Sequence, residues 1–147
     1  MKKLLALALA SAMVLSLAAC GSKDQPSGSQ SSGSSSSGDK VVKIGVFEPA
    51  TGDSASGGKK EMLGMQYANA QTPTVEVGGQ TYQVELVYGD NGSDQSKAPS
   101  AASQLVSAGV SIVLGSYGSG VSMAGGPIFN DAGLAAMGVT CTNPNVT

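Results

Sequence analysis

Residues 40–147 predict an α/β fold in which helices flank a parallel sheet. Short β-rich runs alternate there with segments of helical periodicity, in the order β-α-β-α-β-α-β. This alternation is typical of parallel sheets, because each helix carries the chain back to the edge where the next strand starts. The 108 residues involved are enough for one domain with a modest core.

The first β-rich run is Val41–Phe47, whose alternate side chains are apolar on one face. A turn rich in Gly and Ser, Thr51–Gly58, leads from this run to a helical segment, Lys59–Ala70. Apolar residues recur in this segment at helical spacing, which predicts an amphipathic helix. These residues are Met62, Leu63, Tyr67 and Ala70.

The second β-rich run, Val75–Tyr88, contains a glycine pair, Gly78-Gly79, which signals a hairpin or a loop. Asp90-Asn91-Gly92 breaks this run, and Asp94 or Ser96 can cap the helix that follows. The apolar residues of that helix are spaced i, i+3, i+4, i+7, as one helical face requires. They are Ala98, Ala101, Ala102 and Leu105.

The remaining chain predicts one more helix between two more strands. Gly109 ends the preceding helix, and the third β-rich run, Val110–Leu114, follows directly. A loop of Gly and Ser, Gly115–Gly120, then leads into the third helix, where Gly125-Gly126-Pro127 predicts a weak point or a kink. Gly133 ends the third helix, and Leu134–Val139 is the fourth run.

The first 19 residues predict a signal peptide, with Lys2 and Lys3 before the apolar stretch Leu4–Leu17. The order Leu-Ala-Ala-Cys, which ends at Cys20, resembles a bacterial lipobox. That resemblance implies a lipid on the Cys20 thiol, removal of residues 1–19 and anchoring on the outer face of the cell membrane. The alternative is an ordinary signal peptide followed by a coincidental cysteine.

A linker, Gly21–Gly38, separates the lipidated Cys20 from the globular part. Nine Ser and four Gly occupy its eighteen positions, and it has no large apolar residue to bury. As a flexible coil it spans on the order of 20–25 Å, which suits a membrane tether; a low-complexity interaction tail is the alternative. The chain therefore divides into a signal peptide (1–19), a lipidated linker (20–39) and a partial lobe (40–147).

The composition argues against most enzyme classes and against nucleic acid. The chain has no His and no Arg, and loss of Lys2 and Lys3 leaves a net charge of −4. A nucleic-acid surface and a Ser-His-Asp triad are therefore not expected. Neither G-x-S-x-G nor the P-loop motif occurs, and the spacing in Gly115–Gly120 fits a dinucleotide fingerprint poorly. We expect no catalytic residue, no metal site and no cofactor.

Two loops after predicted strands form a candidate binding site, since ligands bind at the carboxyl ends of strands in open α/β sheets. In the first loop, Ser119 lies at the start of the third helix, where an anion is favoured, and Gly118 permits close approach. The second loop starts with small side chains. The predicted ligand-binding residues are Gly118, Ser119, Thr140, Cys141 and Thr142. The simpler alternative is capping by Ser119 and a turn at Thr142-Asn143-Pro144.

Four segments, taken in order and spacing, resemble the N-terminal lobe of the branched-chain amino-acid (Leu/Ile/Val) substrate-binding proteins of ABC transporters, the type I periplasmic-binding fold. They are Lys43–Glu48, Val84–Asp90 with Asp94, Gly115–Asp131 with Gly133, and Thr142-Asn143-Pro144 with Thr147. The resemblance implies that Ser119 binds the ligand carboxylate. It also implies that Thr140 offers a backbone carbonyl to the ammonium, Thr142 a hydroxyl to the head group, and Cys141 its backbone to the pocket.

Two departures from the family pattern affect this transfer. The aromatic residue that many relatives have near Ser56–Gly58 is missing. The family's proteins are also longer, with a second lobe that closes over the ligand, so we expect this chain to be an N-terminal fragment that binds weakly alone.

The resemblance implies a monomeric, membrane-anchored, extracytoplasmic lipoprotein that delivers an amino acid of the branched-chain type to an ABC permease. Closure of two lobes around the ligand would be the mechanism, without covalent chemistry. The same fold could instead bind an amide, a urea or an aromatic acid, or act as a sensory ligand-binding domain. An enzyme is the remote third option.

Overall fold

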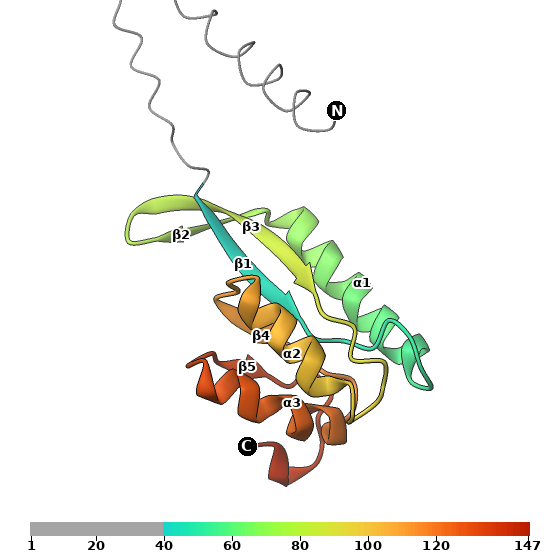
Figure 1. Ribbon diagram of the computed structural model, residues 1–147. Helices are drawn as coiled ribbons and strands as arrows, with labels where there is room; N and C mark the ends of the chain where they lie inside the picture. The colour runs from blue at the N-terminus through green and yellow to red at the C-terminus, as the bar shows by residue number, and fades with distance from the viewer. Residues whose placement is uncertain (1–39) are drawn as a thin grey trace, which may run out of the picture. The chain divides into compact units, whose positions relative to one another are not determined.

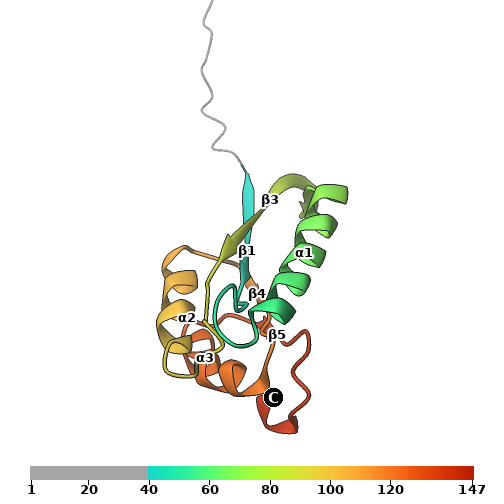
Figure 2. The ribbon, with the colours of Figure 1, turned by 90° about the vertical axis from the view of Figure 1, so that its right-hand side faces the viewer.

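The computed structural model describes residues 40–147, which form a sheet between two layers of helices. The elements in chain order are β1 (Val41–Val46), α1 (Ala55–Gln71), β2 (Thr74–Val77), β3 (Gln80–Tyr88), α2 (Ala98–Ser107), β4 (Ile112–Leu114), α3 (Ser119–Asp131), β5 (Ala136–Met137) and a short 3-10 helix, η1 (Pro144–Val146). Helix α1 lies on one face of the sheet, and α2 and α3 lie on the other (Figures 1 and 2). The predicted α/β class is confirmed.

The sheet is parallel except at one edge. Its strand order is β2-β3-β1-β4-β5, and β1, β3, β4 and β5 run parallel, with Ile44 of β1 opposite both Leu86 of β3 and Ile112 of β4. Strand β2 pairs antiparallel with β3. The two glycines Gly78 and Gly79 form the tight turn between them, with φ of 59° and 75°. The run from Val75 to Tyr88 is therefore a hairpin, the first of the two alternatives that the glycine pair suggested.

The core lies between the sheet and the α2–α3 layer. Phe47, just after β1, is 1% exposed, and its ring meets that of Phe129 from α3 edge-on, with centroids 5.2 Å apart. Helix α3 passes continuously through Gly125-Gly126-Pro127, where a weak point or a kink was predicted. Packing explains the glycine at position 125, since a Cβ there would lie 2.7 Å from the Phe47 ring, so glycine lets α3 approach the core.

Helix α1 covers its face of the sheet less closely. It begins at Ala55, ahead of the predicted Lys59. Glycine suits position 58 in this first turn, since a Cβ there would lie 2.4 Å from the carbonyl oxygen of Pro49. The predicted apolar face is wrong in part, since Leu63 and Tyr67 are 66% and 68% exposed. Other α1 residues line a groove of about 670 Å³ against the sheet, among them Glu61, Met65 and Asn69.

The ends of the elements also differ from the sequence prediction. Neither Asp94 nor Ser96 caps α2: Lys97 is its N-cap residue, and Asp94 instead accepts hydrogen bonds from the backbone and hydroxyl of Ser96. Gly109 and Gly133 end α2 and α3 with positive φ, as predicted. Helices long and apolar enough to cross a bilayer are absent from residues 40–147. The predicted signal peptide, Cys20 and linker lie outside the described residues.

Candidate ligand-binding site

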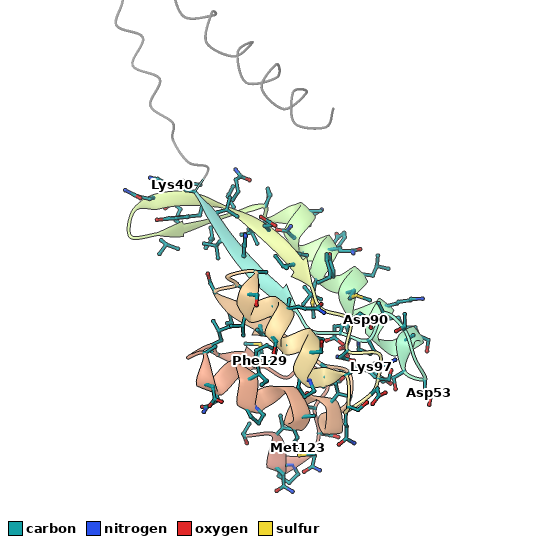
Figure 3. All side chains as sticks on the ribbon, viewed as in Figure 1. Lys40, Asp53, Asp90, Lys97, Met123 and Phe129 are labelled. Carbon is teal, nitrogen blue, oxygen red and sulfur yellow. The ribbon has the colours of Figure 1, made fainter. Side chains whose placement is uncertain are left out.

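Three loops at the carboxyl ends of parallel strands surround a cavity of about 580 Å³. Residues 52–54 follow β1, residues 92–95 follow β3, and Tyr117, Gly118, Gly120 and Val121 follow β4. Figure 3 shows Asp53, Asp90 and Lys97 gathered at this end of the sheet, whereas Lys40 lies at the other end. The cavity therefore lies where ligands bind in open α/β sheets.

Asp90 joins the loop after β1 to the loop after β3. Its Oδ1 accepts hydrogen bonds from the backbone N–H groups of Ala50 (2.9 Å), Thr51 (3.2 Å) and Gly92 (2.9 Å). Its Oδ2 accepts one from the Thr51 hydroxyl (2.7 Å). Partial burial alone would raise the pKa of Asp90, but these hydrogen bonds outweigh it and hold the pKa below its ordinary value.

Asn91 and Ser93 also join the loop after β1 to the loop after β3. Asn91 is fully buried, and its Nδ2 donates to the carbonyl of Phe47 (3.1 Å) while its Oδ1 accepts from the N–H of Ser93 (3.1 Å). The Ser93 hydroxyl accepts from the N–H of Ser54 (2.9 Å). The two loops touch so closely that a Cβ at Gly52 would lie 2.0 Å from the carbonyl oxygen of Gly92.

The loop after β4 brings an aromatic ring to the cavity. The Tyr117 ring lies against Gly57 in the first turn of α1, where a Cβ would be 2.5 Å from the ring. Tyr117 is 39% exposed and lines the cavity. Tyr117 thus brings an aromatic ring from the loop after β4 to the turn at residues 56–58, where the sequence has no aromatic residue of its own.

The N-terminus of α3 opens on the cavity. Its N-cap residue is Gly118, with φ of 117°, and no side chain caps it. The first N–H groups of a helix have no acceptor within that helix, and together with the helix dipole they favour an anion. Ser119 is the first residue of α3, as predicted. Its hydroxyl does not cap the helix, and instead accepts a hydrogen bond from the N–H of Asn143 (3.2 Å).

Cys141 ties the loop after β5 to the loop after β4. Its Sγ lies 2.8 Å from the Ser122 hydroxyl and donates to the carbonyl of Ser116 (3.2 Å). Ser116 is itself fully buried, and its hydroxyl donates to the carbonyl of Gly118 (3.1 Å). This thiol network therefore holds together the two loops that carry the predicted ligand residues.

The predicted ligand residues fall into two groups in space. Gly118 lines the cavity, whereas Ser119, Thr140, Cys141 and Thr142 are not among its lining residues in the described part of the chain. Thr140 and Thr142 are exposed. Their loop, which follows β5, lies beside the start of α3, because Asn143 contacts Ser119 and Cys141 contacts Ser122. The structure thus brings the two loops together, with the cavity on the Gly118 side.

Sequence reasoning missed several residues around the cavity. Asp53 and Asp94 line it, and hydrogen bonds from the hydroxyl and backbone of Ser96 lower the pKa of Asp94. The signal that could have found these residues and Tyr117 is position, since each follows the carboxyl end of a parallel strand. Within residues 40–147 no group of three or more Cys, Asp or Glu side chains could hold a metal ion.

Comparison with known proteins identifies the family. The family model described as "Periplasmic binding protein" matches residues 41–147. The chain belongs to the periplasmic binding protein family. This is a family of binding proteins, not of enzymes, and its fold matches the parallel sheet and helices described above.

Several relatives of this periplasmic binding protein are named for branched-chain amino acids. It is 33% identical over 106 residues to Leu/Ile/Val-binding protein homolog 2 of Brucella abortus, covering 72% of this chain and 28% of that one. The leucine-binding protein LivK of Thermotoga maritima has a similar structure, with a TM-score of 0.66, 34% identity and coverage of 72% and 29%. LivJ of Streptococcus pneumoniae, solved with isoleucine, has a TM-score of 0.64, 28% identity and coverage of 73% and 31%. This chain spans less than a third of the length of these relatives.

Proposed function

We propose that this periplasmic binding protein takes up an α-amino acid of the branched-chain type, outside the cytoplasm, and delivers it to an ABC permease. The observation that carries the proposal is the uncapped N-terminus of α3, which borders a cavity that Asp53 and Asp94 also line. The names of the Brucella and Thermotoga relatives and the isoleucine in the Streptococcus structure support this solute class.

The site matches the two charges of an amino acid. The free N–H groups at the start of α3, with Ser119 beside them, suit the α-carboxylate. Asp53 and Asp94 line the cavity, and a carboxylate suits the α-ammonium. Tyr117 and Val121 offer apolar surface to an aliphatic side chain. Thr140, Cys141 and Thr142 would reach the solute through the loop that Cys141 and Asn143 hold against α3.

Transport requires that the solute be enclosed and released. In the proposed mechanism a second lobe closes over the loops at the carboxyl ends of the strands, because the closed state binds the solute better than the open state does. The greater length of the relatives is consistent with such a lobe. A lipid on Cys20 and the linker would keep the protein near the permease, on the outer face of the membrane.

Calorimetric titration tests the solute class. In the protein with its proposed second lobe, we expect leucine, isoleucine and valine to bind, and 4-methylpentanoate, which is leucine without its amino group, to bind far more weakly. Benzoate is the matched probe for the second candidate, an aromatic acid, which the benzoate complex of a Rhodopseudomonas palustris binding protein at 26% identity favours. Binding of benzoate without any binding of α-amino acids would replace the amino-acid proposal with the second one.

Replacement of Ser119 by alanine is expected to weaken amino-acid binding about 10- to 150-fold. The variant loses a hydrogen bond to a charged carboxylate, worth roughly 1.5–3 kcal/mol. The same titration measures the loss, with Ser119→Thr as the variant that keeps the hydroxyl and Ser107→Ala, at the exposed end of α2, as the control. Unchanged affinity in Ser119→Ala would show that this hydroxyl serves only Asn143.

Replacement of Cys20 by serine is expected to abolish lipid attachment, because the thiol is the group that accepts the lipid. Metabolic labelling with a fatty acid, followed by membrane fractionation, measures this change. Cys141→Ser is the control, since Cys141 lies in the folded lobe and should leave labelling intact. Labelling that persists in Cys20→Ser would refute the anchor.

A further inference from the structure

Glu48 is a buried carboxyl that contacts the loop of the candidate site. It follows β1, is 1% exposed, and its Oε2 accepts a hydrogen bond from the backbone N–H of Tyr117 (2.7 Å). Its Oε1 is buried without a hydrogen-bond partner. The loop fits tightly over this carboxyl, since a Cβ at Gly115 would lie 2.6 Å from that Oε1. The Glu48 side chain therefore holds the Tyr117 backbone in place through this hydrogen bond.

A second carboxyl faces the first. Glu61 of α1 lies close enough to Glu48 for the two carboxyls to share a hydrogen bond when one of them is protonated, and both Glu61 oxygens are buried without a donor among the described residues. Buried polar atoms are nearly always hydrogen-bonded, and two adjacent carboxylates cannot both stay ionised at low cost. A proton held between the two side chains satisfies an oxygen on each.

We propose that Glu48 and Glu61 share one proton, and that this acid pair positions the Tyr117 loop at the start of α3. The inference rests on the proposed function, because it adds positioning residues to the same site. With the proton in place, Glu48 bridges α1 on one side and the Tyr117 N–H on the other. Without the proton, the two negative charges repel each other, and Glu48 is displaced from the Tyr117 N–H.

The electrostatics of the surroundings agree with this arrangement. Burial, foremost, and then the hydrogen bond to Glu61 raise the pKa of Glu48 to about 8, against the lowering effect of the Tyr117 N–H, and the charge of Glu61 adds to the rise. The charged group beside Glu48 is Glu61 on α1, whereas Tyr117 contacts Glu48 through its backbone and its ring lies against Gly57. Lys43 of β1 is engaged elsewhere, because its ammonium donates to the carbonyl of Ala108 (3.1 Å).

The acid pair also determines how the free energy of unfolding changes with pH. A glutamate in the unfolded chain has the ordinary pKa of 4.5, whereas the folded pKa of Glu48 is about 8. Between these values the folded state holds a proton that the unfolded state releases, so the free energy of unfolding falls as pH rises from 4.5 to 8. Above pH 8 this contribution is constant.

Carbon-13 NMR of the glutamate carboxyls and the amide signal of Tyr117 test the proposal together. We expect the Glu48 carboxyl and the Tyr117 amide to titrate with one midpoint near pH 8. Glu48→Gln keeps both hydrogen bonds, since its amide can donate to Glu61 and its carbonyl can accept from Tyr117, and it should remove the pH dependence of that amide. Glu61→Gln should lower the midpoint of Glu48, and Glu85→Gln, exposed on β3, should leave it unchanged.

These measurements need no solute, so their failure is distinct from a failure of amino-acid binding. Titration of Glu48 near its ordinary pKa, or a Tyr117 amide that ignores the ionisation of Glu48, would overturn the proposal. The titration of the unsubstituted protein decides this even if Glu48→Gln does not fold. If leucine binds, its affinity should fall above pH 8 in the parent protein and stay level from pH 7 to 9 in Glu48→Gln.

Discussion

Replacement of Phe47 by alanine is expected to destabilise the lobe by about 3–5 kcal/mol, which is a large part of the stability of a small domain. The side chain is 1% exposed, meets the Phe129 ring edge-on at 5.2 Å and lies against Gly125 of α3. Its loss leaves a cavity between β1 and α3 that the backbone of neither element can close. Urea unfolding followed by circular dichroism measures the change.

Two other substitutions serve as controls for Phe47→Ala. Phe47→Leu keeps much of the buried apolar volume and should cost clearly less than Phe47→Ala. Leu63→Ala also removes a large apolar side chain, but from a position that is 66% exposed on α1, so we expect a change within about 0.5 kcal/mol. Equal losses from Phe47→Ala and Leu63→Ala would contradict the placement of the core between the sheet and α3.

Replacement of Asn91 by alanine is expected to cost about 2–4 kcal/mol. The change leaves the buried carbonyl of Phe47 and the N–H of Ser93 without their partners, and a buried group that loses its hydrogen bond costs roughly 1–3 kcal/mol. Urea unfolding again gives the free energy, and hydrogen exchange of the Ser93 amide reports the junction itself. That amide should exchange faster in the variant.

Asn130→Ala is the matched control, because Asn130 is exposed on α3 and the same atoms are removed there. A small loss of stability in Asn91→Ala, comparable to that of Asn130→Ala, would mean that the loops after β1 and β3 are held together without Asn91.

Hydrophobic spacing was sufficient to predict the fold class and most elements. The alternation of β1, α2, β4 and α3 follows from apolar residues at periods of two or 3.6, and the glycines at 109 and 133 ended their helices as expected. The start of α1 could not be predicted in this way. Gly57 and Gly58 disfavour a helix locally, and only their contacts with Tyr117 and Pro49 make glycine suitable there.

The candidate site was predictable only at the level of its loops. The sequence placed Ser119 at the start of α3, because that depends on local spacing. The contacts of Tyr117 with Gly57 and of Glu48 with Glu61 join residues from separate elements, and their partners follow from tertiary packing alone. A buried acid such as Glu48 looks in sequence like any solvent-facing acid after a strand.

The hydrogen bonds by which Asp90 joins the loops after β1 and β3 have a thermodynamic consequence. Because its carboxylate holds the N–H groups of Ala50, Thr51 and Gly92, the conformational entropy of these loops is lost when the chain folds. A solute that enters the cavity then contacts loops that are already ordered, so its binding free energy does not include the entropic cost of ordering them. The described lobe is in this respect preorganised, and in the proposed mechanism the ordering that accompanies binding would occur in the second lobe.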